Sequence, residues 1–331
     1  MNESSLLNEY QKLLPGAEKL FVIPQIPDIN KNTSYLYQLY KDFLGPSSPL
    51  KLETFNAASL PRIFFSRLKF EKSILHYHWF EFEDFKSFVG IKWKLFWIIL
   101  YKLLGGKIVW TVHNYYPHHN KYIFWNLKAR RLLAKLAHRL HIHCRNEIDN
   151  LSAILKTEKK KFFVVKHPDF NVDIFEREKA INLLNQKYFN NKINYDDKIF
   201  LMFGAIAEYK GIKEVIEIFN NLDKKNKLII AGFIKRHNKS YFYDIKSSEN
   251  EKILIEGSNI PDDDVPFFFN AADYLIFNYK NILTSGGIVL AMNYKKNIIA
   301  PDSGCIKEIN YPHLLKFNRK DITLAHILHS L

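Results

Sequence analysis

The stretch Phe203–Ile212, FGAIAEYKGI, contains the parts of a parallel α/β unit in their usual order. An apolar run ends at Gly204, a short loop follows, and Lys210-Gly211 opens a segment with helical spacing. Gly204 would let a ligand approach the backbone, and Lys210 would place a positive charge beside a helix N-terminus. This arrangement suits a diphosphate, although the same pattern also occurs as a plain connection between a strand and a helix.

On both sides of this stretch, short apolar runs alternate with helical patterns, which is typical of parallel α/β structure. A chain of 331 residues fits two domains. We therefore expect two Rossmann-like domains, residues 1–166 and 167–331, that face each other across a cleft. The boundary is placed at 167–173 (HPDFNVD), and helices are expected to begin near Ile212, Asp262 and Ser285. The expected strands are 19–24, 73–79, 107–113, 139–144 and 161–166 in the first domain, and 198–203, 227–231, 252–255, 273–277 and 297–300 in the second.

The net charge of +14 is concentrated in the first half of the chain. Residues 1–165 carry 25 Lys and Arg against 13 Asp and Glu, whereas residues 166–331 carry 23 against 21. The stretch 85–146 has twelve basic residues and no acidic one. This predicts an anionic partner, either phosphate-rich lipid or nucleic acid. No nucleic-acid-binding motif accompanies it, so we expect no nucleic acid partner.

The segment Trp93–Leu104, WKLFWIILYKLL, has an unbroken apolar core that is too short to span a bilayer. It is either a buried helix of the first domain or an interfacial helix at a membrane surface. A basic segment that follows favours membrane contact. The residues expected at the membrane are Trp93, Phe96, Trp97 and Tyr101 with Lys92, Lys94 and Lys102, and then Lys128, Arg130, Arg131, Lys135 and Arg139.

Two features bear on the compartment. Met1–Tyr10 is polar and lacks the pattern of a secretion signal. Cys144 and Cys305 are too few for a disulfide framework and fit a reducing compartment. A cytoplasmic protein is expected, peripheral on the inner face of the membrane.

Histidines mark the ends of two strands in the first domain. His113 ends the run VWTVH, and the ends of parallel strands point into the ligand crevice. Asn114 and His118 follow on the same loop and are candidates for the acceptor side, as is His78 at the end of its strand. His76 and His78 share one face of their strand, and His141 and His143 repeat that arrangement. Metal binding is not expected, because zinc needs three or four converging ligands.

Four segments together resemble the retaining GT-B glycosyltransferases grouped as family 4. FGAIAEYKGI is similar to their donor loop, G-x-x-x-x-x-K-G. The later segments follow in the order of the family: 260–275 (IPDDDVPFFFNAADYL), 278–292 (NYKNILTSGGIVLAM) and 298–308 (IIAPDSGCIKE). With weaker similarity upstream, the likeness covers roughly residues 70–310.

The resemblance implies a retaining hexosyltransferase with a nucleotide-sugar donor and no metal or other cofactor. His113 would contact the transferred sugar and Lys210 would stabilise the leaving diphosphate. The family usually has an arginine where this chain has Ala205, and two glutamates where Ile282 and Leu290 stand. The expected donor-binding residues are Gly204, Gly211, Lys235, Arg236, Tyr279, Lys280, Thr284, Ser285, Gly286 and Gly287.

The acceptor is expected to be a lipid-linked saccharide or an oligosaccharide in bacterial surface polysaccharide or glycan assembly. Two alternatives remain open. The three departures from the family pattern would also fit a GT-B-like binding protein that has lost catalysis. The basic first half would also fit a nucleic-acid-binding protein.

Overall fold

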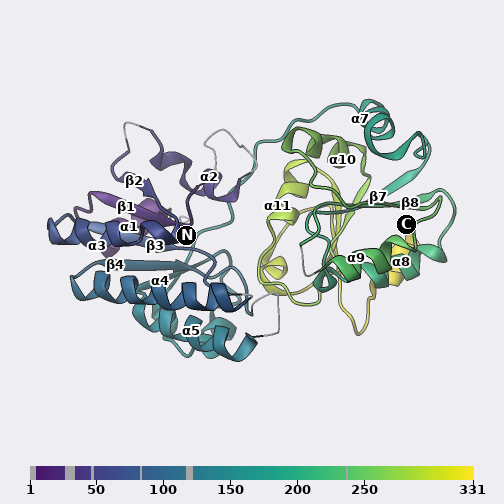
Figure 1. Cartoon of the computed structure of the whole chain (residues 1–331). Helices are drawn as coiled ribbons and strands as arrows, with labels where there is room; N and C mark the ends of the chain where they lie inside the picture. The colour runs from purple at the N-terminus through teal and green to yellow at the C-terminus, as the bar shows by residue number, and fades with distance from the viewer. Residues whose placement is uncertain (1–4, 27–33, 46–47, 83, 117–121, 236–237) are drawn as a thin grey trace. The chain divides into compact units, whose positions relative to one another are not determined.

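The computed structural model describes residues 5–26, 34–45, 48–82, 84–116, 122–235 and 238–331. The chain divides into two compact units, Met1–Pro168 and Asp169–Leu331. The boundary predicted between residues 166 and 167 lies beside this division. Each unit contains a six-stranded parallel sheet with helices packed against it (Figure 1). The predicted α/β fold with two Rossmann-like units is therefore confirmed.

Unit 1 has the strand order β2-β1-β3-β4-β5-β6. The order reverses between β1 and β3, and ligands of open parallel sheets bind at the carboxyl ends of strands beside such a switch point. The helices α4 and α5 lie side by side against this sheet (Figure 1). The elements are α1 Leu6–Leu13, β1 Lys19–Ile23, α2 Tyr35–Tyr40, β2 Lys51–Thr54, α3 Pro61–Leu68, β3 Ser73–Tyr77, α4 Phe85–Leu103, β4 Lys107–Thr111, α5 Ile123–Leu136, β5 Arg139–Ile142, α6 Ile148–Leu155 and β6 Phe162–Val164.

Unit 2 has the strand order β9-β8-β7-β10-β11-β12. This is the order of a doubly wound nucleotide-binding sheet, and its switch point lies between β7 and β10. The elements are α7 Arg177–Leu184, a π-helical turn Asn185–Phe189, β7 Lys198–Phe203, η6 Glu208–Lys210, α8 Ile212–Asn220, β8 Asn226–Ala231, α9 Lys239–Lys246, β9 Ile253–Glu256, η8 Asp262–Asp264, α10 Val265–Ala271, β10 Tyr274–Ile276, α11 Gly286–Asn293, β11 Asn297–Pro301, η9 Gly304–Glu308, β12 Leu314–Phe317 and α12 Leu324–Ser330.

All ten predicted strands are present, and the analysis of the sequence missed β2 and β12. Both are four-residue strands at a sheet edge, KLET and LLKF, and both are partly exposed. These two edge strands are not apolar on both faces, so their sequences lack the continuous apolar run that identifies the other ten strands.

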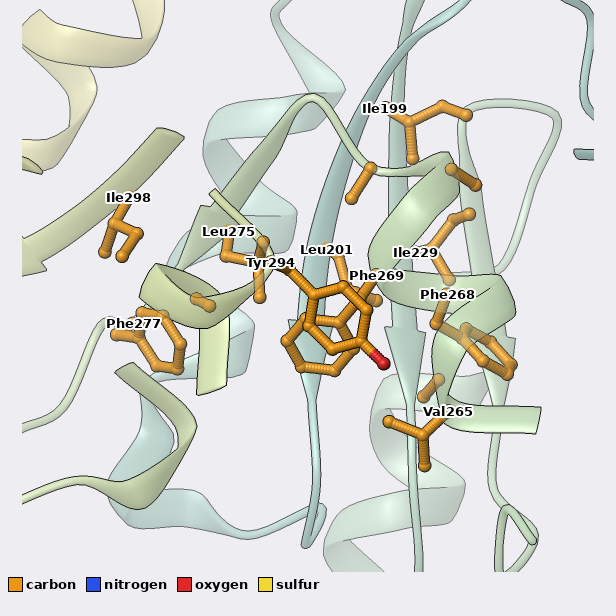
Figure 2. Close-up of a cluster of buried hydrophobic side chains, with 14 of the residues drawn as sticks. Ile199, Leu201, Ile229, Val265, Phe268, Phe269, Leu275, Phe277, Tyr294 and Ile298 are labelled. Carbon is orange, nitrogen blue, oxygen red and sulfur yellow. The ribbon is translucent and has the colours of Figure 1, made fainter. Parts of the chain in front are cut away.

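The central strand β7 shows how the sheet of unit 2 is buried on both faces. Ile199 and Leu201 point to one side and pack with Phe268 and Phe269 of α10 (Figure 2). Phe200 and Met202 point to the other side and belong to a second apolar cluster. Because successive side chains of a strand alternate between faces, a run of six apolar or amphipathic residues is what a fully covered parallel strand requires.

Candidate functional site

The switch point of unit 2 brings together two segments that the sequence singled out. Residues 204–211 follow β7, and residues 277–285 follow the neighbouring strand β10. Tyr209 and Tyr279 stack with ring centroids 6.0 Å apart, and the N–H of Lys280 donates to the carbonyl of Tyr209 at 2.9 Å. The predicted donor loop and the predicted donor helix are therefore adjacent in the folded unit.

The backbone at the start of the predicted donor loop, residues 204–211, requires glycine. Gly204 has a φ of 96°, which side chains rarely adopt, and its N–H donates to the carbonyl of Ala231 at 2.9 Å. Gly232, which follows β8, approaches this glycine so closely that a Cβ there would lie 2.1 Å from the carbonyl oxygen of Gly204. Gly232 was not predicted from the sequence, because glycine is required there by the backbone of the neighbouring strand end at Gly204. The ends of β7 and β8 thus place two glycines without side chains beside the loop, of which Gly204 is partly exposed and Gly232 is buried.

Lys210 lies under this loop rather than extending into solvent. Its Nζ donates to the carbonyl of Phe203 at 2.7 Å, and a Cβ on Gly204 would lie 3.2 Å from that Nζ. Its side chain is buried, and burial lowers the pKa of Lys210 to about 7. The amine is therefore held beside the glycine backbone with little charge compensation from the protein, which is a suitable position to meet an incoming anion.

The turn at Gly211 is set by contact with the segment after β10. Gly211 has a φ of 62°, and a Cβ there would lie 2.7 Å from the carbonyl oxygen of Asn278. The Asn278 amide donates to the carbonyl of Gly211 at 3.0 Å and to Glu214 at 2.8 Å. The side chain of Tyr241 lies beside Gly211 and Lys213 at the start of α8. The N-terminus of α8 thus lies beside a tyrosine that the sequence gave no reason to choose.

Ser285 caps α11, which begins where the sequence predicted a helix. Its Oγ accepts from the N–H of Ile288 at 3.4 Å and is hydrogen-bonded to the hydroxyl of Tyr279 at 3.0 Å. Thr284, Gly286 and Gly287 are partly exposed, and they leave the first turn of α11 without bulky side chains. This helix start therefore combines two hydroxyls with free backbone N–H groups, a combination that favours an anion.

The three cations proposed to replace the missing arginine differ in position. Lys280 and Gly211 line a pocket of about 360 Å³ together with the carboxylates of Glu208, Glu214 and Asp244. Lys213 also lines the pocket, so three carboxylates face two amines, and this excess of negative charge disfavours a diphosphate there. Lys235 follows Ile234, which forms a parallel bridge with Ile206, so the backbone of Lys235 also lies beside residues 204–211. Arg236 lies outside the described residues.

The positions matched to the family glutamates are apolar and packed. Ile282 is buried in the main apolar cluster of unit 2, and Leu290 packs against that cluster. The glycine at 304 is fixed by this segment, since a Cβ there would lie 2.3 Å from the carbonyl oxygen of Ile282. Any recognition of sugar or ribose by these two positions would use backbone groups and shape instead of carboxylates.

In unit 1, His113 and His78 lie next to each other at the carboxyl ends of β4 and β3. His78 Nδ1 and His113 Nε2 are 3.0 Å apart, and the indole of Trp79 stacks on His113 with centroids 4.5 Å apart. His78 is fully buried, and its Nε2 is hydrogen-bonded to the Tyr40 hydroxyl at 2.8 Å. Both ring nitrogens of His78 are thus engaged, so the predicted direct contact between His78 and an acceptor does not fit this geometry. His78 supports His113 instead.

The backbone after His113 is held by a hydrogen bond from Arg130. The Arg130 guanidinium donates to the carbonyl of Asn114 and lies over the Trp110 ring, 5.5 Å from its centroid. Burial lowers the pKa of Arg130 to about 10. His118, the other candidate on this loop, lies outside the described residues. Arg130 therefore has a structural role in unit 1. The sequence had predicted that Arg130 would contact a membrane.

The remaining histidines form a buried network with tyrosines. His76 and His78 stack with centroids 4.6 Å apart, and the rings of His141 and His143 are 4.7 Å apart, which confirms that each pair shares a face. Tyr10, Tyr35, Tyr40 and Thr111 complete the network, and the sequence analysis missed all four. They come from α1, α2 and β4, so only the tertiary structure brings them to the histidines.

An exposed apolar surface runs along the helices that cover the sheet of unit 1. On α4, Phe85, Val89, Trp93 and Phe96 are all exposed and recur at helical spacing. Other exposed apolar side chains come from α3, the turn after it, and α5: Phe65, Leu68, Phe70, Ile123, Phe124, Trp125 and Leu132. Lys92, Lys128 and Lys135 are exposed among them. We call this set the aromatic surface. Contiguous exposed apolar side chains of this extent mark an interaction site.

Several residues expected on that surface are in fact elsewhere. Tyr101 is fully buried, and its hydroxyl donates to the Ser73 carbonyl at 2.8 Å. Arg130 is buried, and Arg139 pairs with Glu9 at 2.7 Å. The helical period explains the error for Tyr101, because its position on α4 faces the sheet. Within the described residues, no helix is long and apolar enough to cross a membrane.

The comparisons with known proteins agree with this architecture. Residues 185–317 match the family of glycosyl transferases group 1. This segment lies within unit 2 and includes the donor loop and α11. No curated protein sequence matches the chain significantly.

Solved structures share the fold over nearly the whole chain. Alr3699/HepE from Anabaena, in its complex with UDP, superimposes with a TM-score of 0.65 at 12% identity, covering 95% of this chain and 89% of that one. Sucrose-phosphate synthase from Thermosynechococcus elongatus gives a TM-score of 0.65 at 11% identity, with coverage of 95% and 88%. A glycosyltransferase from Rickettsia africae gives 0.60 at 15% identity, with coverage of 96% and 87%. The two units therefore have the GT-B fold.

Proposed function

We propose that this chain is a glycosyltransferase that moves a sugar from a nucleotide-sugar donor to a saccharide acceptor. The observation that carries the proposal is the switch point of unit 2, where Gly204, Lys210 and the Ser285 helix start surround the carboxyl ends of β7 and β10. Backbone N–H groups and a lysine at this place suit a diphosphate. Group 1 family similarity in the same unit supports this assignment.

In the proposed reaction the configuration of the sugar is retained. The acceptor hydroxyl attacks the anomeric carbon from the side of the departing diphosphate, and a phosphate oxygen takes the hydroxyl proton as the glycosidic bond to phosphate breaks. This course needs no carboxylate nucleophile, in keeping with Ile282 and Leu290 at the matched positions. Lys210 and the α11 N–H groups stabilise the negative charge that develops on the diphosphate. His113 orients the sugar. No metal or other cofactor takes part in this scheme.

A donor screen tests the proposal. The full chain is incubated with a panel of nucleotide sugars, beginning with UDP-glucose because the Anabaena protein has been solved in complex with it. Bound nucleotide is detected by native mass spectrometry, and turnover is followed by release of nucleoside diphosphate. Lys210→Ala is expected to lower turnover by at least tenfold, and Lys320→Ala, at an exposed lysine of the same unit, is expected to leave it unchanged. Turnover of Lys210→Ala within a few-fold of wild type would remove Lys210 from the phosphate site. Binding without turnover of any donor would favour a binding protein that has lost catalysis.

We further propose that the acceptor is lipid-linked and that the aromatic surface docks on the anionic inner leaflet of a bacterial membrane, in surface polysaccharide or glycan assembly. The stripe of Phe85, Val89, Trp93 and Phe96 lies along one side of α4, and Lys92 lies 4.8 Å above the Phe88 ring. On α5, Lys128 lies 4.4 Å from the centroid of Phe124. Aromatic rings with lysines at the same depth suit the boundary between acyl chains and phosphate headgroups.

Vesicle sedimentation tests the membrane proposal. The chain is expected to bind vesicles with anionic phospholipid and to be released by salt, because each lysine near the surface contributes about 1 kcal/mol. The double variant Phe96→Ser and Phe124→Ser is expected to bind about tenfold more weakly, since two half-exposed phenyl rings lose about 1.4 kcal/mol or more of burial. Ile322→Ser, at an exposed apolar residue of unit 2, is the control and leaves binding unchanged. Equal binding of the double variant and wild type would exclude the aromatic surface as the contact.

A further inference from the structure

Trp79 is an exposed aromatic residue at the carboxyl end of a central strand of unit 1. It is the second residue after β3, and its side chain is 39% exposed, whereas its neighbours His78 and Phe80 are buried. The order of the sheet reverses between β1 and β3, so Trp79 stands beside the switch point. A large aromatic side chain is therefore presented to solvent at the place where open parallel sheets bind their ligands.

The backbone of Trp79 is strained and is fixed on both sides. Its φ is 23°, in a region that bulky residues rarely adopt. Before it, the N–H of His78 donates to the carbonyl of Ile23 at 2.8 Å. After it, the side-chain amide of Asn126 bonds both the N–H and the carbonyl of Phe82, at 3.0 and 2.8 Å. Strain of this kind persists only where the surrounding structure enforces it, and such positions cluster at ligand sites.

The orientation of the indole ring is set by its contacts with other rings. His113 lies parallel to it, with centroids 4.5 Å apart and an interplanar angle of 9°. Tyr35 and His78 meet it at 72° and 40°, with centroids 5.8 and 5.6 Å away, so neither lies flat on it. Within the part of the chain that the structure describes, no second aromatic ring stacks on the indole. The exposed part of Trp79 therefore belongs to the face away from His113 and to the ring edges.

A fixed and open indole face suits a pyranose ring. The face of an aromatic ring carries partial negative charge, whereas the C–H groups on the flat faces of a pyranose carry partial positive charge. Stacking the two removes apolar surface from water and leaves the sugar hydroxyls at the rim, where they keep their hydrogen bonds. A nucleobase could use the same surface. However, the groups that suit a nucleotide diphosphate, Gly204 and Lys210, belong to unit 2, which has a switch point of its own.

We propose that the open face of Trp79 is a stacking platform for a pyranose ring of the saccharide acceptor. The identity of that ligand as an acceptor rests on the proposed function, whereas the exposure, strain and orientation of the ring do not. The other exposed tryptophans of the described residues, Trp93 and Trp125, lie on α4 and α5 within the aromatic surface. Trp79 thus provides for sugar binding an element that is separate from the proposed membrane contact.

Saturation-transfer difference NMR of the full chain without nucleotide tests the platform. The probes are the methyl glycosides of glucose, galactose, mannose, N-acetylglucosamine and rhamnose, and the aromatic protons of the protein are irradiated. A ring stacked on a pyranose transfers saturation to the C–H groups of one sugar face. At least one glycoside is expected to show this pattern. Absence of transfer to every glycoside from the wild-type protein would overturn the proposal without the use of any variant.

Substitutions identify the ring that is responsible. Trp79→Ala is expected to lower the transfer about tenfold, because the stacked apolar area is lost. Trp79→Phe keeps a smaller aromatic face and is expected to lower the transfer less. Trp125→Ala is the matched control, since it removes another exposed indole of the same unit, and it leaves the transfer unchanged. Equal transfer from Trp79→Ala and from wild type would overturn the assignment to Trp79.

Trp79→Gly separates sugar binding from folding. Glycine adopts a positive φ without strain, so this variant is expected to unfold at the same temperature as Trp79→Ala or at a higher one. Its transfer to the glycosides is nevertheless expected to fall as in Trp79→Ala, because both lack the ring. Wild-type transfer in Trp79→Gly would overturn the platform. Unfolding of the glycine variant below the alanine variant would overturn the strained conformation on which the proposal depends.

UDP alone, measured with the same irradiation, distinguishes a sugar from a nucleobase. Transfer to the uracil protons is expected to be equal in Trp79→Ala and wild type, and a loss in the variant would overturn the sugar assignment in favour of the base. A protein that turns over a donor but shows no transfer to sugar that depends on Trp79 refutes the platform and leaves the proposed function intact. Failure of every donor to bind, with a glycoside stacked on Trp79, refutes the proposed function and leaves the sugar platform standing.

Discussion

Binding of a nucleotide sugar at Lys210 is expected to take up a proton. Burial lowers the pKa of Lys210 to about 7, so about half of the free protein carries a neutral amine at pH 7. A diphosphate beside the amine favours its charged form and raises this pKa again. The bound complex then holds more protons than the free protein across the neutral range.

The size of the effect follows from the pKa. If Lys210 is fully charged in the complex, uptake is about 0.5 proton at pH 7 and about 0.9 at pH 8. The affinity then falls about fivefold from pH 7 to pH 8, which corresponds to about 1 kcal/mol. A lysine with an ordinary pKa would give no uptake and no change of affinity in this interval.

Isothermal titration calorimetry measures both quantities. Titrations at each pH are run in two buffers with different ionisation enthalpies, and the difference in heat gives the number of protons. A nucleotide sugar is used because its diphosphate is esterified at both ends and lacks the phosphate proton that titrates near pH 6 in a terminal monoester. Lys210→Met is expected to bind more weakly and without proton uptake, and Lys320→Ala to behave as wild type.

A ligand-free measurement checks the same pKa. The unfolded lysine keeps its proton up to its ordinary pKa near 10.4, whereas the folded one releases it near 7. The unfolded state therefore binds more protons between these values, and the contribution of Lys210 to stability rises with pH through that interval. The gain in stability of Lys210→Met over wild type should be largest below pH 7 and shrink toward pH 10. Proton uptake near zero at pH 8, or a gain in stability independent of pH, would refute the reasoning.

Two further changes test the backbone and the core. Gly232→Ala would place a Cβ 2.1 Å from a carbonyl oxygen at a φ of 145°, so we expect a loss of several kcal/mol or failure to fold, read by thermal unfolding. Gly90→Ala, where a Cβ meets nothing within 4 Å in α4, is the control and should stabilise by up to about 1 kcal/mol. Tyr101→Phe removes the hydroxyl bonded to Ser73 and is expected to cost about 1–3 kcal/mol in denaturant unfolding, whereas Tyr243→Phe at an exposed site should cost almost nothing.

The candidate donor site could be predicted to a large extent because its parts lie at strand ends. Gly204, Gly211 and Ser285 each stand where an apolar run stops and a helical pattern begins, and parallel strands bring such ends to one edge. The requirement for Gly232 could not be predicted, because it arises from a backbone approach between two strands. The position of Tyr241 beside the start of α8 could not be predicted either, because Tyr241 belongs to a different helix.

The same distinction holds in unit 1. The pairing of His76 with His78 and of His141 with His143 follows from the period of a strand, and it was visible in the sequence. Their partners Tyr10, Tyr40 and Thr111 are remote in the chain, so no local pattern connects them to the histidines. The sequence of the basic segment 85–146 likewise gives its total charge, but it does not show which of its cations are buried and which are exposed. Arg130 faces the interior and Lys128 faces solvent, although they stand two positions apart.

The sequence by itself determined ten of the twelve described strands, the two-unit organisation and the place of the glycine-rich turns, because those depend on local period and on backbone conformations that few residues adopt. Only the tertiary structure decided the edge strands β2 and β12, the burial of Lys210 and Tyr101, and the contacts between the histidines and tyrosines of unit 1. These depend on which remote atoms come within hydrogen-bond distance and on how much water is excluded, and neither quantity is encoded in any one segment.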